Sequence, residues 1–270
     1  MAAAGLYGSA DFLGGLAAKR GPMLTVTLAA QAIGLVCLLG VVPFYGGHPA
    51  RAELLWSAAG GIFGGIGIAL LYHALAIGKM GVVSPVTAIV AAAFPVTAGV
   101  LRGDPLAWFQ KLGIAVALAA VVLVSLSKED GGREIATTGV KEAIASGIAL
   151  GILFLALGAG QRSGGFDGLL AARIGSVACL LVLAVVLRVP LRPPRLAFGA
   201  IVASGAIDMA ANVCYVIAAQ TGALAIASVL TSLYPASTVF LARFVLGERL
   251  AAVQKAGVAL ALIGVALIAA

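Results

Sequence analysis

The segment GERLAAVQKAG at Gly247–Gly257 repeats the pattern of GDPLAWFQKLG at Gly103–Gly113, 144 positions earlier. In both copies an acidic residue follows the first glycine, a leucine comes two positions later, and Gln-Lys stands two positions before the closing glycine. Both copies lie between very apolar stretches. The repetition indicates that the chain is built from two related halves.

A second match supports the duplication, because Cys37–Leu39 and Cys179–Leu181 both read Cys-Leu-Leu, 142 positions apart. The drift between 142 and 144 positions is what short loop insertions produce. We predict a first five-helix repeat at 1–127, a connecting loop at 128–138 and a second five-helix repeat at 139–270. The two repeats form one integrated transmembrane domain in this prediction.

The composition predicts a membrane protein. Of the 270 residues, 62% are hydrophobic and 10% are charged, whereas soluble domains have about 45–50% apolar and about 25% charged residues. Continuous apolar runs of membrane-spanning length favour helices over a β-barrel. We therefore predict an all-α, multi-pass protein of the cell membrane with ten transmembrane helices. The predicted spans are 3–18, 22–44, 54–77, 81–101, 107–127, 140–160, 167–187, 196–219, 223–245 and 251–270.

In such a chain the Lys and Arg residues behind the formal net charge of +7 indicate which side of the membrane each loop lies on. We therefore expect no nucleic-acid partner. Loops after the odd-numbered spans carry twelve Lys and Arg residues, and the opposite side carries four. By the positive-inside rule the twelve face the cytoplasm, which predicts both termini outside. No metal or cofactor is expected, because the three cysteines and two histidines lack ligand spacing.

An odd number of spans per half reverses the direction of the second half. The halves are then related by a pseudo-two-fold axis in the membrane plane, an arrangement found in many secondary transporters. Two matching halves can open a central site to each side of the membrane in turn, which is alternating access.

The end of the second half, YPASTVFLARFVLGE at Tyr234–Glu248, has a proline followed twelve residues later by Gly-Glu. Leu250, Gln254 and Gly257 then enter the last span. Together with the five plus five spans, this pattern resembles the ten-helix EamA branch of the drug/metabolite transporter superfamily. The resemblance covers nearly the whole chain.

The first half departs from the family pattern, because Gly103 follows Pro95 by only eight positions, and Asp104 stands where glutamate is usual. The resemblance implies that helices 1, 3, 4, 6, 8 and 9 contribute to a central cavity, with helices 5 and 10 as scaffold. It also implies cytoplasmic termini, against the charge count. We follow the count.

Two acidic residues inside the spans are our main candidates for substrate binding or proton coupling, because an ionisable group in a bilayer is costly unless it faces a cavity or a partner. Asp11 lies near the middle of the first span and Asp208 near the middle of the eighth. Ser204, Asn212 and Tyr215 extend Asp208 into one polar stripe at helical spacing. A stripe of this kind predicts the lining of a central cavity.

Five further side chains complete this candidate set: Tyr7, His73, Arg173, Thr231 and Tyr234. Structural alternatives stay open for several of the candidates. Asp11 can serve as a structural hydrogen-bonding group, and Asp208 can form a buried pair with Arg173. Arg173 can also extend to the lipid headgroups, and His73 can be an interfacial residue instead of a proton relay.

Prolines and glycines inside the spans predict breaks and close packing. Pro85, Pro95 and Pro235 fall in the fourth and ninth spans, which are equivalent, and are candidates for hinges or helix breaks beside the site. GGIFGGIG at Gly60–Gly67 contains overlapping GxxxG patterns, which predict tight packing of the third span against a neighbour.

The Gly-acid motifs themselves are predicted to be structural. Gly103 and Gly247 allow tight turns between helices. Asp104 and Glu248 are expected near the N-termini of the fifth and tenth helices, where a carboxylate interacts favourably with the helix dipole.

From these features we predict a permease, a secondary transporter that moves small metabolites such as amino acids or related compounds across the cell membrane by alternating access. The resemblance implies export. The predicted partners are the small-molecule substrate, the lipid bilayer and, through Asp11 or Asp208, protons, with the oligomeric state open. The alternatives are a passive channel or facilitator without ion coupling, and an intramembrane enzyme, for which the sequence has no HExxH or GxSxG motif.

Overall fold

The structure is a computed structural model that describes residues 2–45, 47, 49–101, 107–125, 138–160, 166–220, 234–248 and 252–269. These residues form ten α-helices and one short 3-10 helix. The first half contains α1 (Ala2–Ala18), α2 (Met23–Leu39), η1 (Val42–Phe44), α3 (Arg51–Ile77), α4 (Met80–Leu101) and α5 (Trp108–Ser125). The second half contains α6 (Val140–Gly160), α7 (Asp167–Val186), α8 (Arg195–Gln220), α10 (Tyr234–Val245) and α11 (Ala252–Ala269).

The helices have the apolar exterior of a multi-pass membrane protein. Four of the described helical segments are long and apolar enough to cross a bilayer, and only 33–44% of each apolar window is buried inside the protein. The remaining surface is therefore apolar and faces outward. Leu55, Leu196 and Phe244 are each more than two-thirds exposed, a costly arrangement in water and a favourable one in lipid.

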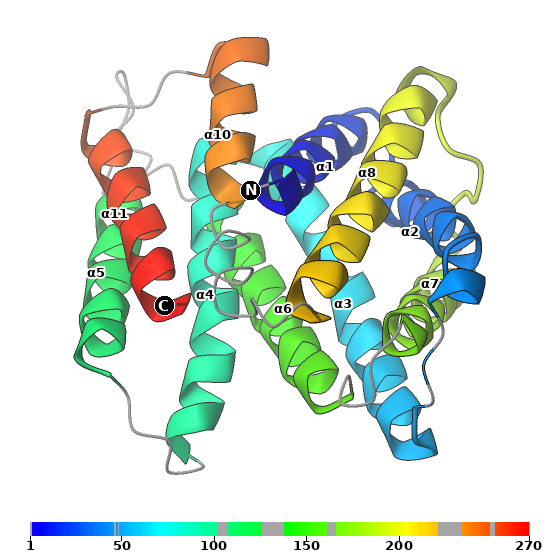
Figure 1. The fold of residues 1–270 in the computed structure, drawn as a ribbon. Coiled ribbons are helices and arrows are strands. Elements are labelled where there is room, and N and C mark those ends of the chain that lie inside the picture. Colours follow the sequence, from blue (N-terminus) through cyan, green and yellow to red (C-terminus); the bar gives the residue numbers. More distant parts are fainter. Residues whose placement is uncertain are drawn as a thin grey trace.

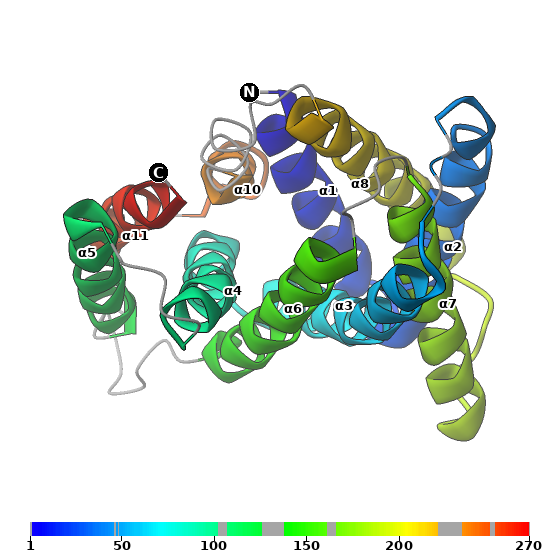
Figure 2. The same cartoon turned by 60° about the horizontal axis from the view of Figure 1, so that its bottom comes forward.

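The described helices form two rows that face each other (Figure 2). One row contains α10, α1 and α8, and the other contains α4, α6 and α3. Helices α5 and α11 pair at one end of the rows, and α2 and α7 lie at the other end (Figures 1 and 2). Each row mixes helices from both halves of the chain, so the halves fold together as a single unit.

The helix contacts follow a two-fold pattern. α3 packs against α6 as α8 packs against α1, and α3 packs against α7 as α8 packs against α2. α4 also packs against α6 as α10 packs against α1. In each comparison, every helix of the first contact is replaced in the second contact by the equivalent helix of the other half, so that α1 corresponds to α6, α2 to α7, α3 to α8 and α4 to α10. This pattern is the one expected of two inverted repeats.

The directions of the helices agree with the inversion. The Arg20 guanidinium, just after α1, donates a hydrogen bond of 3.1 Å to the Leu196 carbonyl near the start of α8. Gly78, at the end of α3, lies against the Thr138 carbonyl just before α6. Helices α1 and α3 therefore end on the face of the bundle where α6 and α8 begin. The all-α fold of ten helices in two inverted repeats is confirmed.

We name the face where α1 and α3 end the basic face, since the loops and helix ends there carry most of the described cations. These are Lys19, Arg20, Lys79, Lys141, Arg188, Arg192, Arg195, Arg243 and Lys255. On the opposite face the Gly47 N–H donates a hydrogen bond of 2.5 Å to the Asp167 carboxylate, and the rings of Tyr45 and Phe166 pack edge to face.

The largest apolar core lies between the two halves on the side of the basic face. It gathers the ends of α1, α3 and α10 and the beginnings of α4, α6 and α8. Its buried members include Phe12, Leu75, Met80, Val83, Val140, Ile201 and Ala242. This packing closes the bundle toward the basic face. The polar residues of α8 lie farther from that face than the core does.

The glycine-rich segment of α3 packs as the sequence predicts. Gly61 and Gly65 lie directly against the backbone of Ala172 and Ser176 in α7. On the other side of the same helix, Gly60, Gly64 and Gly67 lie against Ala156, Leu153 and Leu150 of α6. The small residues bring α3 close to both neighbours at once.

The second Gly-acid motif forms the expected turn, but its carboxylate binds an unexpected helix. Gly247 has a φ of +66°, a conformation that glycine adopts easily. The two carboxylate oxygens of Glu248 accept hydrogen bonds from the N–H groups of Met80 (3.1 Å) and Gly81 (3.2 Å), the first two residues of α4. Glu248 therefore caps a helix of the other half, which the sequence did not predict, and its favourable interaction with the dipole of the last helix stays a prediction. The first copy, Gly103–Asp104, lies outside the described residues.

Candidate functional site

Ionisable and aromatic side chains from five helices gather between the two rows of the bundle, beyond the apolar core. An ion pair, side-chain hydrogen bonds and a ring contact connect them across the helices. We name this group the central cluster. It comprises Tyr7 and Asp11 of α1, Tyr72 of α3, Arg173 of α7, Asp208 and Tyr215 of α8, and Tyr234 of α10.

Arg173 and Asp208 form a buried ion pair. The Arg173 Nη2 lies 2.8 Å from the Asp208 Oδ2, and the two side chains are 8% and 18% exposed. The guanidinium also lies near Gly34 of α2, where an added Cβ would be 3.6 Å from the guanidinium carbon, an ordinary van der Waals contact. The pairing between these two residues is confirmed, and the alternative that Arg173 extends to the lipid headgroups is wrong.

Asp11 has no hydrogen bond or ion pair within the described part of the chain, although it is only 7% exposed. The structural hydrogen bond considered for this side chain is therefore absent there. Asp208 lies one helical turn after Ser204, whose hydroxyl is bonded to the carbonyl of Ala10, so the two carboxyl groups lie near each other. A buried carboxylate is costly without a partner, and among the described residues of the cluster Asp11 has none.

Ser204 links three helices beside Asp11. Its hydroxyl donates a hydrogen bond of 2.8 Å to the carbonyl of Ala10, the residue before Asp11. The same hydroxyl lies 2.8 Å from the Tyr72 hydroxyl, and both side chains are buried. This bridge between α1, α3 and α8 lies between the two acidic residues and the apolar core.

Tyr72 is the residue of the cluster that the sequence analysis missed. Its ring packs directly against Gly14 of α1, so the end of the side chain lies alongside the segment that holds Asp11. One signal was present, because Tyr72 stands 143 positions before Tyr215. That offset falls within the drift of the repeat, so the pair marks equivalent positions of the two halves.

Tyr7 and Tyr234 close the side of the cluster formed by α1 and α10. Their ring centroids are 6.5 Å apart with an interplanar angle of 63°. The helices meet closely here, because Gly8 lies against the backbone of Tyr234 and its carbonyl accepts a hydrogen bond of 3.1 Å from the Thr238 hydroxyl. Three tyrosines from three helices, at 7, 72 and 234, therefore lie along the segment of α1 that holds Asp11.

The predicted polar stripe on α8 becomes more exposed with distance from the basic face. Ser204 is fully buried, Asp208 is partly exposed, and Asn212 and Tyr215 are also partly exposed. The Asn212 amide donates a hydrogen bond of 2.8 Å to the Asp208 carbonyl of its own helix. The cluster is thus closed toward the basic face, and its exposed side is turned toward the opposite face.

His73 is not brought into the central cluster. It lines a 440 Å³ pocket together with Lys19 and other residues from the ends of α1 and α3 and the start of α2. The alternative of an interfacial histidine agrees with this position. Thr231, the other remaining candidate, lies outside the described residues.

The expected helix breaks at the prolines of α4 do not occur. The helix continues from Met80 to Leu101 through both Pro85 and Pro95. Pro235 is the second residue of the described part of α10 and is buried, a position near a helix start that proline tolerates. A hinge role for the three prolines stays a prediction.

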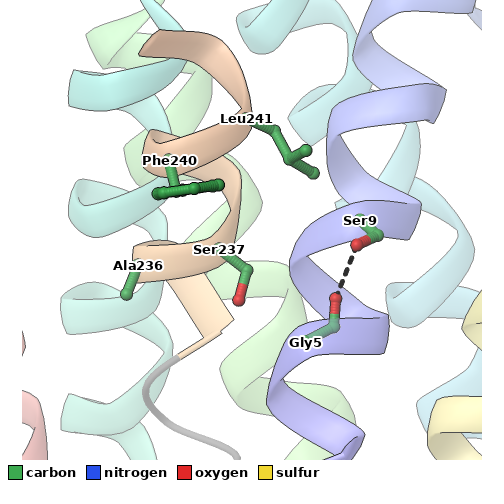
Figure 3. Close-up of a pocket in the computed structure, with 6 residues that line it drawn as sticks. All are labelled: Gly5, Ser9, Ala236, Ser237, Phe240 and Leu241. Carbon is green, nitrogen blue, oxygen red and sulfur yellow. Dashed lines mark hydrogen bonds between the residues drawn. The ribbon is translucent and has the colours of Figure 1, made fainter. Parts of the chain in front are cut away.

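A second depression lies on the outer side of the α1–α10 contact (Figure 3). This 380 Å³ cleft is lined by Gly5, Ser9, Ala236, Ser237, Phe240 and Leu241. The Ser9 hydroxyl donates a hydrogen bond of 2.7 Å to the Gly5 carbonyl of its own helix, as Figure 3 shows. Phe240 is 60% exposed, so the cleft belongs to the apolar exterior and not to the central cluster.

Comparison with known proteins agrees with this architecture. The model of the EamA-like transporter family matches the chain twice, at residues 1–126 and 137–270. A solved structure described only as "Crystal structure of protein" aligns with 98% of this chain and 95% of its own chain, with a TM-score of 0.61 and 17% sequence identity. The chain has no significant match among curated proteins. Because the two family matches cover nearly its whole length, the chain belongs to the EamA-like transporter family, a non-enzymatic family of multi-pass membrane transporters.

Proposed function

We propose that the protein is a secondary transporter that exports small metabolites, such as amino acids or related compounds, across the cell membrane by alternating access. Membership of the family implies membrane transport, and the substrate and mechanism are our proposal. One observation carries it: Asp11, a buried carboxyl group with no bonding partner among the described residues, lies beside the Arg173–Asp208 pair between the two rows of the bundle.

The charges of the cluster are not explained by the repeat. The positions 142 residues away from Asp11 and Asp208 are occupied by Leu153 and Ile66. A scaffold that only needs symmetric packing would place apolar residues at all four positions. The added carboxyl groups are costly in a membrane interior, and binding of a polar substrate or a proton gives a reason for keeping them.

The apolar core and the Ser204 bridge support alternating access. They close the cluster toward the basic face, while the stripe on α8 is partly exposed in the other direction. An exchange of packing between the two inverted halves would close the exposed side and open the basic face. Protons enter the proposal through Asp11 and Asp208, whose charge state would then change during each transport cycle.

Counterflow in proteoliposomes tests this proposal. Vesicles loaded with a mixture of unlabelled amino acids and amines are expected to accumulate a labelled member of that mixture transiently, which a passive channel does not do. Asp208→Asn and Asp11→Asn should each slow the exchange about tenfold or more, because each removes a charged contact with substrate. Arg192→Ala, at an exposed position on the basic face, is the control and should exchange at the unaltered rate.

The same vesicles separate coupled from uncoupled transport. If Asp11 or Asp208 binds protons during the cycle, an imposed pH gradient drives accumulation in the unaltered protein but not in the Asn variants. Exchange at an unchanged rate in both variants and at all pH values would overturn the assignment of the site. Conduction without counterflow would favour the passive channel.

A further inference from the structure

We infer that the central cluster selects an organic monocation, an alkyl- or arylalkylammonium ion, over zwitterions and anions. This inference rests on the proposed function and narrows its substrate class, because among amino acids and related compounds it favours those that carry an ammonium group without a carboxylate. It follows from three features: the charge count of the cluster, the tyrosines around Asp11 and the fixed position of Arg173.

The charges of the cluster sum to one unpaired negative charge when both carboxyl groups are ionised. Arg173 and Asp208 neutralise each other at 2.8 Å. Asp11 is only 7% exposed, and it has no partner of its own among the described residues. A buried charge is stable only when it is paired. A monocation beside Asp11 makes the whole cluster neutral.

The surroundings of Asp11 suit a cation with an apolar body. Tyr7 stands one turn before it on α1, Tyr234 of α10 packs against Tyr7, and Tyr72 of α3 packs against Gly14 of the same helix. Aromatic faces attract ammonium groups through their quadrupoles, and more strongly where water is excluded. A carboxylate combined with several aromatic rings therefore recognises both the charge and the carbon skeleton of an ammonium ion.

The position of Arg173 disfavours a substrate that carries a carboxylate. Its guanidinium is bonded to Asp208 and packed over Gly34, so it is already neutralised. A zwitterion would add a negative charge without a free cationic partner in the described cluster. An anion would leave two uncompensated negative charges in a small buried volume. Both are less favourable than the monocation.

Ligand-induced thermal stabilisation of the purified full-length protein tests the inference, because a ligand that binds the folded form raises its unfolding temperature. Two series vary charge at nearly constant shape: 2-phenylethylammonium, phenylalanine and 3-phenylpropionate, and ethylammonium, alanine and propionate. We expect the ammonium member of at least one series to raise the unfolding temperature, with a dissociation constant at least tenfold lower than those of its zwitterionic and anionic partners.

Substitutions then locate the binding. Asp11→Asn should weaken ammonium binding about tenfold to a hundredfold, the range of a charge-assisted contact, and Asp11→Glu should restore most of it. Tyr234→Phe keeps the ring and should bind nearly as well, whereas Tyr234→Leu should bind several-fold more weakly. The Asp11→Glu variant keeps the test valid if the Asn variant does not fold.

Each outcome decides a different point. Preferential binding of phenylalanine or alanine that depends on Asp11 would overturn the inference and leave the proposed transport site intact. Stabilisation by ammonium ions that is equal in the unaltered protein and in Asp11→Asn would overturn both the inference and the site. A lack of stabilisation by either ammonium ion would overturn the inference.

Discussion

Replacing Arg173 with alanine is expected to lower the free energy of unfolding by about 3–5 kcal/mol, the cost of leaving one partner of a buried ion pair alone. The pair has one bond of 2.8 Å and is almost completely buried on the Arg173 side. The variant leaves Asp208 next to Asp11 without a cation among the described residues of the cluster. Thermal unfolding in detergent, followed by tryptophan fluorescence, measures the effect.

Two further variants show whether the lost stability comes from breaking the ion pair. Arg192→Ala removes a cation from an exposed position and should change stability by less than about 0.5 kcal/mol. The double variant Arg173→Met/Asp208→Leu removes both charges and should recover much of the lost stability, because apolar replacements of a buried pair are often tolerated. Equal unfolding temperatures for Arg173→Ala and Arg192→Ala would show that the pair contributes nothing to the fold.

Adding a single methyl group at Gly61 is expected to destabilise the bundle by about 3 kcal/mol, at the upper end of the range for overpacking. The new Cβ would overlap the Ala172 carbonyl of α7. A backbone atom cannot rotate away as a flexible side chain can, so the two helices must separate. The loss exceeds the gain of about 1 kcal/mol that alanine brings to a helix interior.

Gly199→Ala is the matched control for this prediction. Gly199 also lies inside a long helix, but nothing is within 4 Å of the position of its added Cβ. We expect this variant to be as stable as the unaltered protein or slightly more stable. If Gly61→Ala unfolds at the same temperature as Gly199→Ala, the close contact between α3 and α7 is not present in the folded protein.

Most helix boundaries could be predicted from composition, because glycines and charges end the apolar runs. The prediction of 140–160 matches α6 at Val140–Gly160, and 81–101 differs from α4 by one residue. The span at 22–44 ended earlier, since α2 stops at Leu39 and a 3-10 turn follows. Val41, Val42 and Phe44 keep that stretch apolar, so hydropathy does not detect the turn.

The acidic residues of the site could be found from sequence, but their partners could not. Asp11 and Asp208 are conspicuous because charges are rare inside apolar runs. Tyr72 is an ordinary residue for such a helix, and its role depends on the contact of α3 with α1. Glu248 binds the start of α4 from 168 positions away, a pairing that only the packing of the two halves creates.

The central cluster is asymmetric, whereas the helix packing around it follows the two-fold repeat. The repeat explains matched contacts such as α3 on α6 and α8 on α1. It does not explain why Asp11, Arg173 and Asp208 appear once each. A symmetric frame therefore carries an asymmetric binding site, which is what a transporter needs if one substrate is to be held in both of its conformations.

Water access to the central cluster is the most direct test of this account. In a chain without its native cysteines, a cysteine at Asn212 reports on the cluster, because this residue is on the polar stripe of α8. A chain that keeps only Cys214, exposed on the outer side of the same helix, is the control. We predict that a membrane-impermeant thiol reagent modifies Asn212→Cys rapidly from the side opposite the basic face, and Cys214 hardly at all, since a thiol needs water to ionise and react. Equal, slow modification of both positions would contradict the account, because the acidic cluster would then face lipid and not a transport path.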